Sequence, residues 1–371
     1  MSRTIEYQIT ESAAGQKISG FLKGKGYSEQ NLVNLKKDEK SIWLNGCCVH
    51  MNRFVEAGDV LRVTIREQDS SEQIRPVELA VQIVYEDDDL MVINKPAGMP
   101  IHPSRNNPDN SLGNALAWLY QKRGEPFVFR CINRLDRDTS GLTIVAKNMV
   151  SAAILGRMVQ QKAQEGGIHR EYLAIVDGIL DEKDGTVSAP IARKESRNLE
   201  RVVDFACGER AITHYHVVEE YKSASLVSLV LETGRTHQIR VHMKHLGHPL
   251  LGDFLYHPGY AANQVDRVEA GSGAQAAIGN RFAGCAQDGG NVALEATEGS
   301  CGSQVQTGKE SCDGAQLQAG SRHSIRRQAL HASRLMFTHP MTGEALTFTA
   351  PLPDDMQELR RKLSGGAAAR L

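Results

Sequence analysis

The sequence predicts an α+β protein, in which a small N-terminal α/β unit precedes a larger body that mixes strands with helices. Three observations carry this prediction. Residues 16–66 contain a separate set of helical and strand patterns. A polar stretch follows, and from residue 79 onwards apolar strand-like runs alternate with helical segments. The 371 residues exceed one typical domain but do not require three.

The N-terminal unit, residues 1–66, combines two short helical patterns with a hairpin. Ile18, Phe21 and Leu22 have helical spacing, and Asn45-Gly46 is the dipeptide most typical of a two-residue hairpin turn. Six lysines crowd the helical part: Lys17, Lys23, Lys25, Lys36, Lys37 and Lys40. Composition alone favours an ordinary solvated surface for them over a phosphate-facing patch.

Residues 67–78 are polar and are interpreted as a linker. The body is expected to span 79–363. Its predicted elements, in chain order, are two strands about an acidic turn in 80–96, a helix in 111–124, a strand in 141–148, a helix in 149–165, strands in 170–180 and 224–234, a helix in 236–247 and a core segment in 327–353. Ser111 is a candidate N-cap for the first helix, and Gly124 its stop.

The composition changes sharply in 258–326, which is rich in Gly, Ala, Ser and Gln. A segment of this kind buries too little apolar surface to offset the entropy of ordering it, so we expect a disordered insertion. The end of the chain, 364–371, is expected to be a flexible tail.

The totals restrict the class of protein. Hydrophobic residues make up 41% and charged residues 23%, as in a soluble globular protein. No apolar run reaches the ~18–20 residues that cross a bilayer, and the N-terminus lacks a signal core, so we expect a cytoplasmic protein without a membrane partner. Seven cysteines without a repeated C-x-x-C spacing argue against a disulfide scaffold and a zinc site. A net charge of −1 does not indicate nucleic-acid binding, although a local patch could still provide it.

The stretch "CINRLDRDTSGLTIVAKN", 131–148, concentrates charge before an apolar run. If it is extended, Arg134, Asp136 and Asp138 share one face, and 139–141 supplies a turn. A carboxylate beside arginines stays ionised and can act as a nucleophile or base. Spacing alone favours the simpler alternative, a charged turn with a surface ion pair.

A second charged stretch, "GRTHQIRVHMKHLG", is predicted to be a helix that Thr236 caps. Ile239, Met243 and Leu246 would form its apolar stripe, and Arg240, one position round, could face a pocket. The nearby histidines do not have the spacing of a zinc site, so no metal is expected: His237, His242, His245, His248 and His257.

Two further stretches have weaker signals. Tyr172 lies in an apolar strand, where a core tyrosine is the simplest interpretation. The loop "INKPAGMPIHPS", 93–104, is stiffened by prolines and follows a strand, which is a common place for substrate contacts.

Taken in order, these stretches resemble the RluA-type pseudouridine synthases. The matching motifs are Asn94-Lys95-Pro96-Ala97-Gly98 with His102, Arg134-Leu135-Asp136 with Thr139-Ser140-Gly141-Leu142, Tyr172, Gly234 through Arg240, and Leu330-His331-Ala332 with His339-Pro340. The resemblance covers about 80–257 and 327–353. In the N-terminal unit, the order helix, turn, helix, "LNG" and "GDVLRV" resembles an S4 RNA-binding domain. That second resemblance raises the phosphate-binding interpretation of Lys23, Lys25, Lys36 and Lys37.

The resemblance implies a mainly antiparallel catalytic sheet with flanking helices, and an isomerase that converts uridine to pseudouridine in RNA, most plausibly large-subunit ribosomal RNA. It assigns the catalytic carboxylate to Asp136, the paired cation to Arg240 and base stacking to Tyr172. It implies RNA-contacting or base-flipping roles for Arg134, His102, Arg235 and His237. Neither a cofactor nor a partner other than RNA is implied, and a monomer is expected.

Two departures from the family pattern are visible: Asn133 stands where His is usual, and Glu171 follows Arg170 where Lys is common before the tyrosine. Asn133 is the one feature that favours an alternative, an RNA-binding ribosome-assembly factor without activity. A carboxylate glycosidase acting on free nucleosides is the other alternative, although it gives the basic N-terminal unit no role.

Overall fold

The computed structural model describes residues 2–67, 71, 73–161, 167–195, 199–261 and 325–365. The described residues belong to one compact unit of the chain. The predicted insertion begins with a short helix, α6 (Pro258–Ala261), and its last residues, 325 and 326, are described; the rest of it lies outside the described residues. Of the predicted tail, only 364 and 365 are described.

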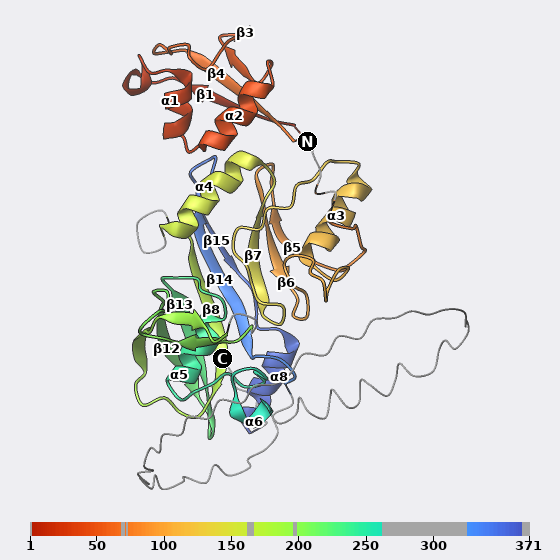
Figure 1. Cartoon of the computed structure of the whole chain (residues 1–371), viewed down its shortest axis with the longest axis vertical. Helices are drawn as coiled ribbons and strands as arrows, with labels where there is room; N and C mark the ends of the chain where they lie inside the picture. The colour runs from red at the N-terminus through yellow and green to blue at the C-terminus, as the bar shows by residue number, and fades with distance from the viewer. Residues whose placement is uncertain are drawn as a thin grey trace, which may run out of the picture. The chain divides into compact units, whose positions relative to one another are not determined.

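The N-terminal segment forms a four-stranded antiparallel sheet with two helices (Figure 1). Its strands, in spatial order, are β1 (Ser2–Gln8), β4 (Val60–Arg66), β2 (Ile42–Leu44) and β3 (Cys47–Cys48). The helices are α1 (Ile18–Gly24) and α2 (Glu29–Lys37). Asn45 and Gly46 both have positive φ, 50° and 80°, as the predicted hairpin turn requires. The first strand, β1, was not predicted.

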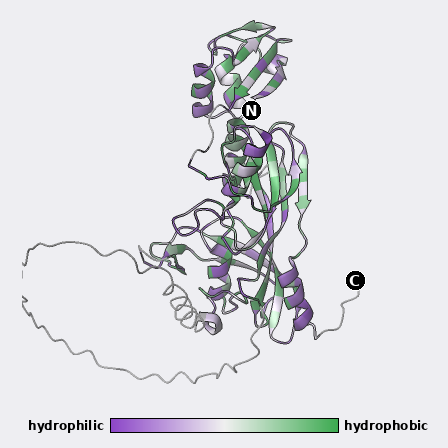
Figure 2. Cartoon of the chain, turned by 90° about the vertical axis from the view of Figure 1, so that its right-hand side faces the viewer, coloured by the Kyte–Doolittle hydropathy of each residue, from purple (hydrophilic) through white to green (hydrophobic). Residues whose placement is uncertain are grey.

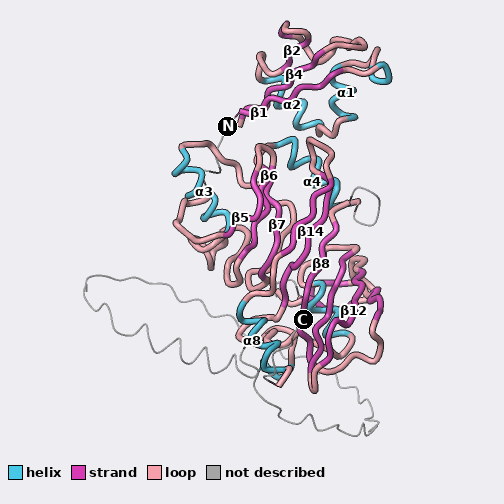
Figure 3. Tube along the Cα trace, turned by 180° about the vertical axis from the view of Figure 1, so that it is seen from behind, coloured by secondary structure: helices cyan, strands magenta, loops and turns pink. Residues whose placement is uncertain are grey.

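The body is built on a nine-stranded sheet (Figures 1 and 3). Eight of its strands follow the order β5-β6-β7-β14-β8-β13-β12-β9, and the ninth, β15, pairs with β14. The strands are β5 (Gln82–Glu86), β6 (Leu90–Lys95), β7 (Ser140–Ala146), β8 (His169–Asp177), β9 (Asp184–Ser188), β12 (Ile212–Glu220), β13 (Ala224–Leu231), β14 (Leu330–Thr338) and β15 (Ala345–Thr349). A separate hairpin joins β10 (Ile191–Arg193) to β11 (Arg201–Val203). The predicted mainly antiparallel α+β architecture is confirmed.

Helices α3 (Leu112–Arg123), α4 (Met149–Gln160), α5 (Gln238–His245) and α8 (Asp354–Leu363) complete the body. Ser111 caps α3 as predicted: its hydroxyl accepts the Asn114 N–H, and the Asn114 side-chain oxygen accepts the Ser111 N–H. Gly124 ends the helix in the left-handed conformation. Figure 2 shows the central strands coloured mainly hydrophobic. No described helix is long and apolar enough to span a membrane.

Strands β9 to β12 and helix α8 were not predicted. Several are only three to five residues long, and their burial patterns mix exposed with buried positions. Short strands of this kind depend on their neighbours in the sheet, which a local pattern does not reveal.

The centre of the sheet is fixed where β7 meets β14, the parallel pair among the described strands. Gly141 has φ +113°, and a Cβ there would lie 2.3 Å from the backbone oxygen of Ala332, so only glycine allows this approach. The Ser140 hydroxyl lies 2.9 Å from Nδ1 of the buried His331 on β14. These contacts hold the start of β7, and the loop that precedes it carries the charged residues.

Candidate active site

The predicted turn lies earlier than expected. The Thr139 N–H donates to the Asp136 carbonyl at 3.1 Å, so the turn is 136–139 rather than 139–141, and β7 begins directly at Ser140. The expected extended face of Arg134, Asp136 and Asp138 does not form, because the last of these side chains is inside the turn and pairs with Arg137. Leu135 is buried beside Asp136 and anchors the loop in the core.

Asp136 and Arg240 form an ion pair, with Nη1 of the arginine 3.2 Å from Oδ2 of the carboxylate. The other side of the guanidinium forks onto Asp253, with Nε and Nη2 at 2.6 and 2.8 Å from its two oxygens. Asp253 is fully buried and Arg240 is only 7% exposed. Burial disfavours the charge on Arg240, but the hydrogen bond and charge of Asp253, with the charge of Asp136, raise its pKa above the ordinary value. A permanent cation therefore faces the carboxylate.

Helix α5 begins differently from the prediction. His237, not Thr236, is the N-cap, and it has the left-handed backbone conformation (φ 58°), which is uncommon for a residue other than glycine. This conformation places its Nε2 3.8 Å from Oδ2 of Asp136, while Nδ1 lies 2.8 Å from the Tyr256 hydroxyl. Burial lowers the pKa of His237 and so favours the neutral imidazole, although the nearby charge of Asp136 acts in the opposite direction. Leu246, expected in the apolar stripe, is partly exposed after the helix.

Strand β8 contributes Arg170 and Tyr172, whose side chains share one face because they are two residues apart. Both are buried, with 7% and 5% exposure. Burial raises the pKa of the Tyr172 phenol, and the charge and hydrogen bond of Arg170 act in the opposite direction. Both side chains line the cavity onto which Asp136 opens.

This reaction cavity has a volume of about 630 Å³. All seven residues predicted as catalytic or base-flipping line it: His102, Arg134, Asp136, Tyr172, Arg235, His237 and Arg240. The four lysines of the N-terminal segment do not line it. A second cavity of about 400 Å³ shares Arg134 and Arg235 with the first and adds Arg193 and Arg201. The two cavities together form a basic surface around the carboxylate.

Lys95 connects the predicted substrate loop to the Asp136 turn, although the sequence analysis gave this residue no role of its own. Lys95, at the end of β6, has no exposed surface, and its ammonium donates to the carbonyls of Pro96, Met99 and Arg137 at 2.7, 2.7 and 3.1 Å. Burial lowers its pKa to about 7, which the charges of Asp138 and Asp136 oppose. The ammonium therefore joins 95–99 to the Asp136 turn.

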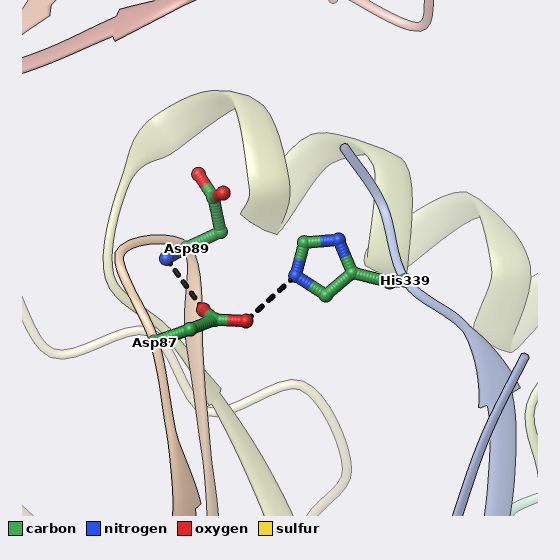
Figure 4. A group of neighbouring side chains, drawn as sticks. All are labelled: Asp87, Asp89 and His339. Atoms are coloured by element: carbon green, nitrogen blue, oxygen red, sulfur yellow. Dashed lines mark hydrogen bonds and ion pairs between the residues drawn. The ribbon is translucent and has the colours of Figure 1, made fainter. Parts of the chain in front are cut away.

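One other cluster of side chains has the composition of a metal site: Asp87, Asp89 and His339 (Figure 4). Nδ1 of His339 accepts the backbone N–H groups of Met341 and Thr342, so its proton is on Nε2 and points at Asp87, 2.8 Å away. Both oxygens of Asp87 also accept protein donors, and Asp89 accepts the fork of Arg3. The cluster is a satisfied hydrogen-bonded corner that leaves no free imidazole lone pair for an ion.

Comparison with known proteins decides the family. Residues 89–245 match the family model described as RNA pseudouridylate synthase. The chain is 34% identical to an uncharacterized RNA pseudouridine synthase of Bacillus subtilis, YjbO, over 90% of this chain and 94% of that protein. It is also 34% identical to ribosomal large subunit pseudouridine synthase D of Haemophilus influenzae, over 97% of this chain and 95% of that protein. The chain belongs to the RNA pseudouridine synthase family.

Among solved structures, human RNA pseudouridylate synthase domain containing 4 matches with a TM-score of 0.49 at 20% identity, over 76% of this chain and 92% of that chain. The family assignment depends on the sequence relatives. As an RNA pseudouridine synthase, the protein is an isomerase that converts uridine to pseudouridine and takes RNA as its substrate.

Within this pseudouridine synthase, Asn133, which lines the cavity, and Asp253 hold the site residues in place. Asn133 is buried, its Oδ1 accepts the Ile144 N–H at 2.8 Å, and its Nδ2 donates to the Leu142 carbonyl at 3.3 Å. It fixes the loop to β7. Asp253 received no role in the sequence analysis, because it is 13 residues from Arg240 in the chain. The structure shows that both side chains are buried and hydrogen-bonded to each other.

Proposed function

We propose that this pseudouridine synthase modifies a uridine of large-subunit ribosomal RNA, with Asp136 as the catalytic carboxylate. The observation that supports this role is the chain of charges from Asp253 through Arg240 to Asp136 at the wall of the reaction cavity. The ribosomal substrate is suggested by the relatives described as ribosomal large subunit pseudouridine synthase D, which match nearly the whole chain.

The reaction moves the base from a nitrogen to a carbon linkage at the same sugar. The uridine N1–C1′ bond breaks, the base turns, and C5 joins C1′ while the C5 proton leaves and N1 gains one. A carboxylate beside C1′ suits this glycosidic chemistry. Arg240 places a positive charge 3.2 Å from Oδ2 of Asp136 and orients the carboxylate at the cavity. Asp136 acts on the sugar, either by attack at C1′ or by removal of a sugar proton.

The other residues of the cavity position the nucleotide. Tyr172 provides a buried aromatic ring against which the flipped base stacks. Arg134 is exposed at the rim, and among the described residues its guanidinium has no hydrogen-bond or ion-pair partner, so it is available to fill the gap that the flipped base leaves. His102, Arg235 and His237 line the same walls and contact the RNA around it.

The RNA on either side of the target follows the basic surface. The second cavity offers the guanidinium groups of Arg193 and Arg201 beside those of Arg134 and Arg235, and arginine forks suit phosphate oxygens. Phe205, 72% exposed in the loop that follows β11, can stack on an unpaired base.

The decisive experiment replaces Asp136 by Asn, which keeps the shape and removes the charge. Turnover on unmodified ribosomal RNA, followed by tritium release from C5-labelled uridine, should fall about 10⁴-fold or more. RNA affinity should change little, because the carboxylate contributes no favourable phosphate contact. If the Asp136→Asn variant were active, Asp136 could not be the catalytic carboxylate. Native protein that releases no tritium would instead favour the RNA-binding assembly factor.

Residues 1–66 are proposed to be an S4-like RNA-binding domain beside a catalytic domain in 79–363. Lys36 and Lys37 are exposed in the last turn of α2, which suits phosphate contacts. Lys23 pairs with Glu29, and the Lys25 ammonium lies 5.5 Å from the centre of the Phe21 ring, so these two are partly engaged.

A double variant tests this assignment. Lys36→Gln with Lys37→Gln should weaken RNA binding and reduce the slope of log affinity against log salt by about 1.5, since each lost phosphate contact removes ~0.7–0.9. Lys183→Gln, on the body and paired with Glu220, is the matched control and should leave the slope unchanged. Equal slopes for the double variant and native protein would reject the lysine patch.

A further inference from the structure

Arg170 is a buried cation in the reaction cavity that the steps above do not use. It is 7% exposed, and its Nε and Nη2 groups are shielded from water without a hydrogen-bond partner among the described residues. A buried charged donor without an acceptor costs about 1–3 kcal/mol or more. Such a group persists at a functional site when its acceptor arrives with the ligand.

The position of Arg170 limits what that acceptor can be. The side chain lies on the same face of β8 as Tyr172 and lines the same cavity. Asp253 and Asp136, the carboxylates of the ion-pair chain, both accept from Arg240. Because the two side chains are neighbours on one face of the strand, a base stacked on Tyr172 would lie beside Arg170. The acceptors on the edge of uracil are the carbonyl oxygens at C2 and C4.

The chemistry adds a reason for a cation at this edge. When the N1–C1′ bond breaks, its electron pair passes to the base and spreads over N1 and the two carbonyl oxygens. The pair is used again when C5 bonds to C1′, after which C5 loses its proton and N1 gains one, so no oxidant or reductant is needed. Between these events the detached base carries a negative charge in a cavity shielded from water, where a fixed N–H donor stabilises it strongly.

We propose that Arg170 donates to a carbonyl oxygen of the target uracil and stabilises the negative charge that collects there when the glycosidic bond breaks. This inference rests on the proposed role of the cavity. Arg170 lines the cavity wall, so a change in its side-chain torsions brings the unpartnered N–H groups to the base. Donation to the C4 oxygen would also disfavour cytosine, whose C4 substituent is itself a donor.

The test uses the full-length protein with Arg170→Met and Arg170→Lys. Under single-turnover conditions with saturating RNA, the methionine variant should lose about 10²–10³-fold in rate, as when an oxyanion-stabilising donor is removed. The lysine variant keeps the charge and should recover part of the rate. Glu171→Gln is the matched control: it lies on the opposite face of β8, accepts from Ser228, and should react like the native protein.

A substrate with a better leaving base separates this role from a purely structural one. RNA with 5-fluorouridine at the target releases a more stable base anion, because fluorine withdraws electrons. Arg170→Met should therefore slow its cleavage much less than that of uridine, by about tenfold or less. Equal losses on the two substrates would overturn the proposal, because misfolding or misplacement affects both alike. If the methionine variant does not fold, the two substrates can be compared with the lysine variant instead.

Deuterium at C5 distinguishes a role in proton removal through Tyr172. If Arg170 acts on bond cleavage, the isotope effect of the methionine variant stays at or below that of the native enzyme. A larger isotope effect would place Arg170 at the C5 proton step and overturn the proposal. If Asp136 is not the catalytic carboxylate, the Asp136→Asn variant will retain activity. That result is independent of the Arg170 measurements.

Discussion

Replacing Asp253 by Asn tests whether the charge behind Arg240 organises the active site. The native carboxylate is fully buried and accepts two guanidinium hydrogen bonds at 2.6 and 2.8 Å, as well as the backbone N–H groups of Leu255 and Tyr256. Asparagine keeps one oxygen for these donors but turns an N–H₂ group towards the guanidinium. Removing one partner of a buried ion pair leaves the other charge uncompensated, which costs about 3–5 kcal/mol.

The expected loss in the free energy of unfolding depends on the carboxylates that still pair with Arg240. Among the described residues, half-buried Asp136 is the carboxylate that still pairs with Arg240, and it contacts Nη1. The free energy of unfolding should therefore fall by about 3 kcal/mol, towards the lower end of that range. The guanidinium also loses the fork that orients it, and displacement of a catalytic pair by about 1 Å reduces the rate about 10²-fold.

Two assays check this, urea unfolding for stability and single-turnover pseudouridine formation for rate. Glu219→Gln is the matched control, because Glu219 also accepts an arginine fork, from Arg360, but both side chains are 32% exposed. It should cost at most about 1 kcal/mol and leave the rate unchanged. If Asp253→Asn were no less stable than the control variant and reacted at the native rate, Asp253 would not organise the site.

Two further predictions concern buried groups beside the site. Lys95→Met should lower the free energy of unfolding by about 2–4 kcal/mol, because three carbonyls lose their donor; an unchanged urea midpoint would contradict this. Burial lowers the pKa of His331 to about 4, whereas the unfolded chain titrates near ~6.5. Only the unfolded state binds this proton between those values, so stability should fall as the pH drops from about 6.5 to about 4, by up to about 3 kcal/mol. His331→Asn should flatten that dependence, and identical slopes would exclude His331 as its source.

The fold was largely predictable where apolar periodicity is strong. The strands of the sheet centre, such as β7 with seven consecutive buried residues, and the capped helix α3 follow from local patterns. Between 184 and 220, β9 to β11 were missed because they are only three to five residues long, and β12 because it has few apolar residues among many polar ones. Their stability comes from pairing with β13 and from the β10–β11 hairpin, which are not encoded in a local window.

The residues proposed for the site could be named from the sequence, but the residues that hold them in place could not. Asp136, Tyr172 and Arg240 were assigned through the family motifs, and the structure places all three at one cavity. Their supporting contacts join segments that are far apart in the chain, as when Arg240 forks onto Asp253 or Lys95 reaches the Arg137 carbonyl. Burial and long-range hydrogen bonding identify such residues, and neither can be read from spacing.

Asn133 shows how a departure from a family pattern can leave a site intact. Its side chain uses one donor and one acceptor, to the Leu142 carbonyl and the Ile144 N–H, on the strand that follows the Asp136 turn. A neutral imidazole offers the same pair of groups, one donor and one acceptor. Asparagine can therefore make the attachment that a neutral histidine would make, without a group that titrates near neutral pH. The one sequence feature that favoured an inactive RNA-binding protein is thus accounted for by backbone hydrogen bonds, and it no longer counts against catalysis.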